Sequence, residues 1–189
     1  GAIEEECSGL RFSLGSEAFF QTNTEMAEKL YATVGQYADL KGWERVYDLC
    51  CGIGSIGLTL APRAGEVIGV EIVEEAVEDA RRNARSNEIT NARFIAGNVR
   101  VVLKEDVEEL GRPDLIVLDP PRSGLSAKVI ARVAEAGAKK IVYVSCNPTT
   151  LAPNAAQLVE AGYKLIRVRP VDMFPQTPHI ECVALFERA

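Results

Sequence analysis

Two segments in the last quarter of the chain carry side chains that could perform covalent and acid–base chemistry. Cys146 stands in the run Val144–Pro148, after a β-branched apolar stretch and before a helical one. A helix N-terminus beside a cofactor loop lowers the pKa of a thiol, so this position predicts a reactive thiolate. On the loop Phe174–Glu181, either His179 or Glu181 could take a proton at neutral pH. The two segments predict a cysteine nucleophile with a general base, against a simpler interpretation as a buried cysteine and a proline-rich turn.

A glycine-rich loop earlier in the chain could hold a nucleoside. Gly52, Gly54 and Gly57 follow a strand-like run containing Asp48, and Glu71 ends the next such run. Glycines allow close approach of the backbone to a ligand, and a carboxylate at Glu71 can accept both ribose hydroxyls. The spacing fits a dinucleotide loop loosely, but Asp48 would repel a pyrophosphate and suits the cationic amino group of methionine. The loop therefore favours S-adenosylmethionine over a dinucleotide, with a merely tight turn as the alternative.

A third motif, Leu118–Leu125, follows another strand-like run and contains Asp119, Pro120, Pro121 and Arg122. Paired prolines stiffen a loop and leave carbonyl groups without competing amides. Amino-group methyltransferases use a similar turn with an aromatic residue after the prolines, which stacks on the target base. Arg122 occupies that place here, so we expect it to contact the substrate, unless the motif is only a rigid connector.

These motifs must be positioned by strands that alternate with helices. Such alternation predicts βαβ units and a parallel sheet, whose ligands bind beyond the carboxyl ends of the strands. Two final strands joined by a proline-rich loop predict one antiparallel edge strand, Glu181–Phe186. The expected strands are 11–14, 46–50, 66–70, 93–96, 114–118, 140–145, 164–168 and 181–186, and the expected helices are 24–37, 54–63, 73–87, 99–110, 127–136 and 153–161.

Composition narrows the classes of protein. The chain has 189 residues with 47% hydrophobic and 25% charged residues, which is typical of one globular domain rather than of disorder. Its most apolar stretch, 46–61, is too short to span a membrane. The net charge of -6 argues against strong nucleic-acid binding by this piece alone. Five cysteines without a CxxC pair fit neither a disulfide framework nor a zinc site, so we expect no metal and a reducing cytoplasm.

In chain order, the segments FFQTN, DLCCGIGSIGL, LDPPRSGL, VSCNP and FPQTPHIE resemble the RNA uracil-5 methyltransferases, which make 5-methyluridine. The resemblance runs from about Arg11 to Arg188 and implies a Rossmann-like methyltransferase fold that uses S-adenosylmethionine. It implies Cys146 as nucleophile and Glu181 as base, with Asn147 and His179 near the substrate. The residues that it implies along the cofactor and target pocket are Gln21, Cys50, Ser55, Glu71, Asn98 and Asp119.

The sequence departs from the family at two of these positions. The position of Cys50 is usually aromatic, and that of Ser55 is usually Asn. The resemblance also implies the chemistry: a thiolate adds to C6 of uracil, C5 takes the methyl group, and a base then removes the C5 proton so that the cysteine leaves.

Domain organisation and partners follow from the same resemblance. We expect residues 1–40 to form an arm, a strand plus a helix, that packs on a catalytic domain at 41–189. Family members usually carry RNA-binding domains before the catalytic one, and these are absent from the chain, whose first residue is Gly1 rather than Met. We therefore expect a monomeric fragment that binds RNA weakly and no membrane.

Two alternatives remain open. An RNA cytosine-5 methyltransferase uses similar covalent chemistry, but it commonly has a second cysteine after the proline where Arg122 stands. A non-catalytic adapter that binds the cofactor for a partner protein would not need Cys146 and Glu181 together.

Overall fold

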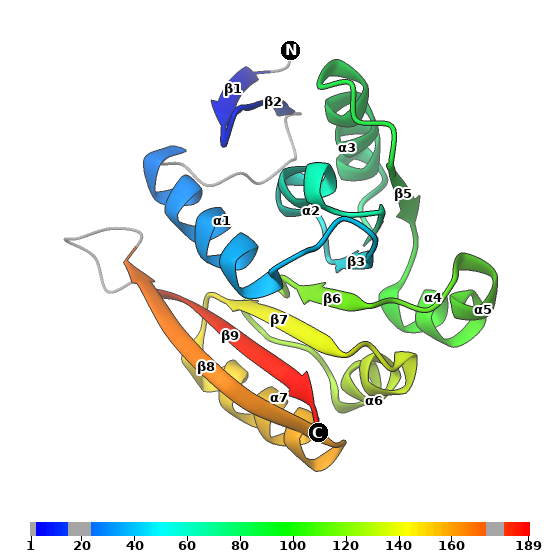
Figure 1. Ribbon diagram of the computed structural model, residues 1–189, viewed down its shortest axis with the longest axis vertical. Coiled ribbons are helices and arrows are strands. Elements are labelled where there is room, and N and C mark those ends of the chain that lie inside the picture. The colour runs from blue at the N-terminus through cyan, green and yellow to red at the C-terminus, as the bar shows by residue number, and fades with distance from the viewer. Residues whose placement is uncertain (1–2, 15–23, 173–179) are drawn as a thin grey trace.

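The computed structural model describes residues 3–14, 24–172 and 180–189. A seven-stranded sheet carries helices on both faces, and a two-stranded ribbon lies beside it (Figure 1). The ribbon pairs β1 (Ile3–Cys7) with β2 (Leu10–Leu14) in antiparallel register. The sequence analysis predicts β2 but not β1, whose run of three glutamates is atypical of a strand.

The main sheet has the strand order β5-β4-β3-β6-β7-β9-β8. Its five parallel strands are β3 (Arg45–Leu49), β4 (Glu66–Glu71), β5 (Ala92–Ala96), β6 (Leu115–Leu118) and β7 (Lys140–Ser145). The last two strands are β8 (Tyr163–Asp172) and β9 (Ile180–Arg188), and β9 runs antiparallel to both β7 and β8. The predicted α/β class and mainly parallel sheet are confirmed.

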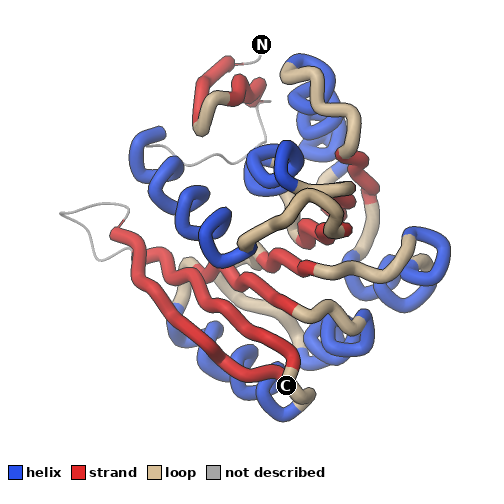
Figure 2. Tube along the Cα trace, viewed as in Figure 1, coloured by secondary structure: helices blue, strands red, loops and turns tan. Residues whose placement is uncertain are grey.

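The antiparallel strand lies one place inside the edge rather than at it. The prediction places 181–186 as the edge strand, but β9 is paired on both sides, and β8 forms the edge. β8 and β9 pair along the whole of Tyr163–Asp172, and β9 also pairs with β7, so these two strands form a long antiparallel ribbon in which β9 is the inner strand. Figure 2 shows this ribbon as the two long strands at one side of the sheet.

The helices divide into two layers. On one face, α1 (Thr24–Ala38), α2 (Ser55–Leu60) and α3 (Glu74–Ser86) bury residues such as Leu30, Leu58 and Val77. On the other face, α4 (Val99–Glu105), α5 (Val107–Leu110), α6 (Ala127–Ala136) and α7 (Pro148–Glu160) do the same. A short 3-10 turn, η1 (Ala61–Arg63), follows α2. Strand residues alternate between these two cores, as a sheet covered on both faces requires.

Two helices differ from their predicted bounds. The predicted helix 99–110 is divided at Asp106, which ends α4 and begins α5. The helix predicted to begin at Pro153 begins at Pro148, because the side chain of Asn147 accepts the amide of Thr149 and caps it. The correct start places Cys146 directly before the helix cap.

The strand order determines where a ligand can bind. The connections from β3 and β6 leave the sheet in opposite directions, so a crevice opens beyond the carboxyl ends of these neighbouring strands. Among the described residues, the glycine-rich loop follows β3, the loop with Asp119 and Arg122 follows β6, the segment with Cys146 follows β7, and Glu181 lies at the start of β9. Among the residues that the structure describes, no helix is long and apolar enough to cross a membrane.

Candidate active site

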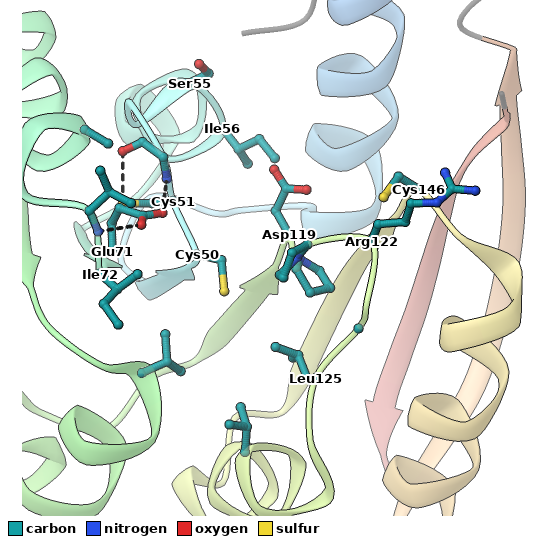
Figure 3. A pocket seen from close by; sticks show the side chains of 18 of the residues that line it. Cys50, Cys51, Ser55, Ile56, Glu71, Ile72, Asp119, Arg122, Leu125 and Cys146 are labelled. Carbon is teal, nitrogen blue, oxygen red and sulfur yellow. Dashed lines mark hydrogen bonds between the residues drawn. The ribbon is translucent and has the colours of Figure 1, made fainter. Parts of the chain in front are cut away.

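A cavity of about 790 Å³ opens at the carboxyl edge of the sheet. The predicted site residues on its wall are Cys50, Gly52, Ser55, Glu71, Asn98, Asp119, Arg122, Cys146 and Glu181. They come from segments that are far apart in the sequence but meet at the ends of adjacent strands. Figure 3 shows Glu71 and Cys50 toward one end of this cavity and Arg122 and Cys146 toward the other.

At the first end, Glu71 ties the glycine-rich loop to the next helix. One carboxylate oxygen accepts the amide of Gly52 at 3.0 Å and the other accepts the amide of Val73 at 2.9 Å (Figure 3). Charge-assisted bonds of this kind fix the carboxylate in one orientation while each oxygen keeps acceptor capacity. Glu71 can therefore accept ribose hydroxyl groups without moving.

Two further residues shape this end. Asn98 caps α4, accepting the amides of Arg100 and Val101 at 2.9 and 3.4 Å. Cys50 has φ +63, a left-handed conformation that costs a non-glycine residue about 1–2 kcal/mol. This turn ends β3 and begins the glycine-rich loop. Burial, followed by the charges of Glu71, Asp119 and Asp48, raises the pKa of Cys50 to about 12, so its thiol is neutral.

Asp48 lies beneath the loop, not on the cavity wall. Its Oδ2 accepts the amide of Gly57 at 3.0 Å, and its Oδ1 is buried without a hydrogen-bond partner. Burial raises its pKa to about 7; the Gly57 amide opposes this rise and Glu71 adds to it. An unpaired buried carboxyl oxygen is costly. A cationic or amide group brought close to the loop would reduce that cost, which fits the predicted methionine amino group.

Two further predicted residues, Gly54 and Asn147, lie off the cavity wall. A side chain at Gly54 (φ +87) would meet Phe94 and Ala80 at 3.0–3.2 Å, so this glycine faces α3 and β5 rather than a ligand. Asn147 caps α7 and donates to the carbonyl of Arg122 at 3.0 Å. Asn147 therefore joins the start of α7 to the segment Leu118–Leu125, called here the proline loop. Gln21 and His179 lie outside the described residues.

At the second end, two carboxyl groups face the cavity. Burial raises the pKa of Glu181 from its ordinary 4.5 to about 7. The pKa of Asp119 is also raised, by desolvation first and then by Asp48, Glu181 and Glu71. Asp119 remains accessible from the cavity, so water there moderates the rise. A carboxyl group with a pKa near 7, such as Glu181, is suited to proton transfer.

The thiol of Cys146 differs from its predicted state. The sequence predicts a lowered pKa, whereas the structure raises it, through burial first and then through Glu181 and Asp119. Arg122 and the thiol's own backbone amide act in the opposite direction but are weaker. The prediction considers the helix N-terminus and the neighbouring cofactor loop, but not the burial of the thiol or the carboxyl groups of Glu181 in β9 and Asp119 after β6. Cys146 is therefore a thiol that deprotonates at alkaline pH in the absence of substrate.

Sequence reasoning misses the apolar part of the wall. Ile72 and Val73 are 66% and 44% exposed directly after Glu71. Tyr31 of α1 also reaches the cavity. Together with Val99, Leu125 and Val129 they form the apolar part of the wall of the cavity that Glu71 also lines. The available signal was a pair of large apolar residues in the turn between β4 and α3, where solvent exposure is expected.

A family model described as tRNA (Uracil-5-)-methyltransferase matches residues 6–189 of the chain. The chain belongs to this family. The family resemblance predicted from the five motifs is thereby confirmed, and so is the methyltransferase fold.

Two similar proteins match this chain along nearly its whole length. An uncharacterized RNA methyltransferase of Geobacter sulfurreducens is 52% identical over 184 residues, which are 97% of this chain and 37% of that protein. One of Enterococcus faecalis is 48% identical over 187 residues, 99% of this chain and 41% of that protein. The chain thus spans about two-fifths of the length of these relatives.

A solved structure agrees with the fold. The tRNA (uracil-54, C5)-methyltransferase of Pyrococcus abyssi, in complex with S-adenosyl-L-homocysteine, has a TM-score of 0.85 and 34% identity. The similarity covers 98% of this chain and 44% of that one. This similarity supports the methyltransferase fold described above.

Proposed function

We propose that the chain is the catalytic part of an S-adenosylmethionine-dependent methyltransferase that acts on C5 of a uridine in RNA. The observation that carries this proposal is one cavity with two chemically distinct ends. One end has the donors and acceptors for a nucleoside, Gly52, Glu71 and Asn98, and the other has Cys146 and Glu181. The family description and the Pyrococcus abyssi enzyme both favour a uridine of transfer RNA as the target, with a uridine of ribosomal RNA as the alternative.

The first end fits the cofactor in three respects. Glu71 has acceptor capacity for ribose hydroxyls, the apolar side chains of Ile72 and Val73 suit an adenine ring, and Asp48 Oδ1 lacks a partner beneath the methionine side. When bound, S-adenosylmethionine supplies an electrophilic methyl group. The chain's own contribution is to hold that group toward the second end and to exclude water from it.

The second end performs the covalent chemistry. Uracil C5 is a weak nucleophile, so addition of the Cys146 thiolate to C6 is needed to move electron density to C5. C5 then takes the methyl group, which leaves a proton and a methyl group on the same carbon. Glu181 removes that proton, the C5–C6 double bond re-forms and the bond between C6 and Cys146 Sγ breaks. Glu181 suits this step because burial brings its pKa to about 7.

RNA that contains 5-fluorouridine tests the proposal. Fluorine at C5 cannot leave as a proton does, so the covalent product stays on the enzyme after methyl transfer. We expect a protein–RNA adduct that requires S-adenosylmethionine and maps to the peptide containing Cys146. The Cys146→Ser variant should form no adduct and no 5-methyluridine.

Cys182→Ser is the matched control. Cys182 pairs with Ser145 across β7 and β9, next to the site but off the cavity wall. This variant should retain both adduct and product. An adduct on Cys50, with Cys146 dispensable, would contradict the assignment of the nucleophile. An adduct with 5-azacytidine RNA alone would favour cytosine methylation, and cofactor binding without any adduct would favour an adapter.

A further inference from the structure

One face of the N-terminal half of α7 is hydrogen-bonded to the loop Leu118–Leu125. Asn147, Thr150 and Asn154 recur at the spacing that places side chains on one helix face. Asn147 Nδ2 donates to the carbonyl of Arg122 at 3.0 Å, and the hydroxyl of Thr150 shares its one proton between that carbonyl at 3.2 Å and the carbonyl of Asn147 at 3.1 Å. The helix that follows Cys146 is therefore joined to the loop that carries Arg122.

Asn154 makes the tightest of these connections. Its Oδ1 accepts the amide of Leu125 at 3.0 Å, and its Nδ2 donates to the carbonyl of Leu125 at 2.8 Å. The hydroxyl of Tyr143, in β7, donates to the same Oδ1 at 2.7 Å. Asn154 is only 4% exposed and Tyr143 only 1%. Because both lie in the core, this amide is held from the strand before Cys146 and from the helix after it.

The backbone of the loop is shaped for this contact. Gly124 has φ +75, and a side chain there would meet Thr150 at 2.8 Å and Asn154 Oδ1 at 3.1 Å. A glycine is required both for the conformation and for the approach. Its amide also donates to the carbonyl of Pro121 at 2.8 Å, which closes the turn. None of these contacts involves a group that faces the cavity as a reactant.

We propose that Asn154 is a positioning residue, which fixes the Arg122 loop against the Cys146 helix through its two bonds to Leu125. The consequence for methylation rests on the proposed function. The consequence for the thiol does not, because it depends only on where the Arg122 guanidinium stands relative to Cys146 Sγ.

The pKa of the Cys146 thiol depends on the position of the Arg122 loop. The charged groups that act on Cys146 are Glu181 from β9, Asp119 at the end of β6 and Arg122 in the loop, and Arg122 is the one that favours the thiolate. Asp119 stays bonded through its amide to the carbonyl of Leu49, outside the α7 contacts. Release of the loop should therefore remove the favourable charge and leave the unfavourable ones.

Alkylation of Cys146 measures this effect without RNA or cofactor. The rate of iodoacetamide modification, followed for the Cys146 peptide by mass spectrometry across pH, should fall about three-fold at a fixed pH in Asn154→Leu, with the midpoint moved to higher pH. Asn154→Asp keeps the acceptor for the Leu125 amide and for Tyr143 but loses the donor to the Leu125 carbonyl and adds a buried carboxyl group, so it should recover only part of the rate. In the methylation assay, Asn154→Leu should lower kcat about ten- to a hundred-fold, with KM for S-adenosylmethionine little changed.

Gln157→Ala is the control on the same helix, since Gln157 accepts from Asn154 Nδ2 at 3.3 Å but does not contact the loop. It should match the parent protein. If Asn154→Leu does not fold, Thr150→Val removes one bond to Arg122 at a partly exposed position and should slow alkylation in the same direction. Unchanged alkylation profiles in folded Asn154→Leu, or in Thr150→Val where that variant replaces it, overturn the proposal. Where the parent protein methylates uridine, an altered alkylation profile together with lost methylation in Asn154→Leu supports the proposal. Where the parent protein itself methylates no uridine, an altered alkylation profile in Asn154→Leu still supports the positioning role and refutes only the proposed function.

Discussion

The two ends of the cavity treat their polar groups differently. At the end proposed to bind the nucleoside, called here the nucleoside end, the side-chain oxygens of Glu71 and Asn98 accept hydrogen bonds from backbone amides of the loops that they shape. At the reactive end, the carboxyl groups of Asp119 and Glu181 make no side-chain hydrogen bond within the described residues, and their pKa values are raised. Both ends are built at the same sheet edge from the same kinds of residue.

This difference follows from what each end must do. A group that recognises a ligand works best when it is already oriented, and bonds to the backbone supply that orientation. A group that exchanges a proton works best when its protonation is balanced near neutral pH, and backbone bonds to a carboxylate would lower its pKa and spoil that balance. The absence of such bonds at Glu181 is therefore consistent with a chemical role, and their presence at Glu71 with a binding role.

The largest expected effect comes from a substitution that changes the reactive end alone. Glu181→Gln should lower turnover about 10²- to 10⁴-fold, the usual contribution of a general base. Adduct formation and methyl transfer should still occur, so methylated RNA bound to Cys146 should accumulate and be released slowly. Rapid-quench analysis of the covalent and free RNA separates these species.

The pH dependence follows from the raised pKa of Glu181. Below about pH 7 the carboxyl group is protonated and cannot accept the C5 proton, so release should accelerate as the pH rises through about 7 and then level off. Glu181→Gln should lose this dependence while its affinity for S-adenosylhomocysteine stays the same. His179→Ala should reduce turnover without trapping the methylated species. Trapping in the His179 variant, with normal turnover in Glu181→Gln, would reverse the assignment of the base.

The fold could be predicted well because alternating strands and helices determine which residues reach the sheet edge. Glu71, Asp119 and Cys146 all follow β-branched runs, so their meeting at one edge follows from the parallel sheet. The thiol pKa could not be predicted in the same way. It depends on charges from β6 and β9 whose distances from Cys146 are set by tertiary packing.

The hydrogen bonds that join α7 to the Arg122 loop could not be predicted from the sequence either. A helix start placed at Pro153 leaves Asn147 and Thr150 outside the helix, so their common face with Asn154 cannot be recognised. The apolar wall is a different case. Ile72 and Val73 are visible in the sequence, but apolar residues are common in every element, and only their exposure in the structure distinguishes them.

The second effect tests the nucleoside end. Glu71→Ala should weaken binding of S-adenosylhomocysteine by about 1–3 kcal/mol, through loss of bonds to the ribose and of the loop's own support. Calorimetry measures this change, and Glu71→Gln should recover part of it. Glu66→Ala is the control on the same strand, because Glu66 pairs with Arg45 and Arg93 at the opposite end of β4. Equal affinity in Glu71→Ala and the parent protein would remove the basis for the ribose contact.

The smallest expected effect asks whether the two ends are electrostatically separate. Glu181 raises the pKa of Cys146, whereas Glu71 is not among the groups that do so. Removing the Glu181 charge lowers the thiol pKa and increases the thiolate fraction, so Glu181→Gln should alkylate at Cys146 about three- to ten-fold faster at alkaline pH. Below about pH 7 the Glu181 carboxyl is already neutral, so parent and variant curves should converge there. Glu71→Gln should follow the parent curve throughout. If Glu71→Gln instead accelerates alkylation as much as Glu181→Gln does, the charges of the cavity act on the thiol collectively, and the division into a binding end and a reactive end fails.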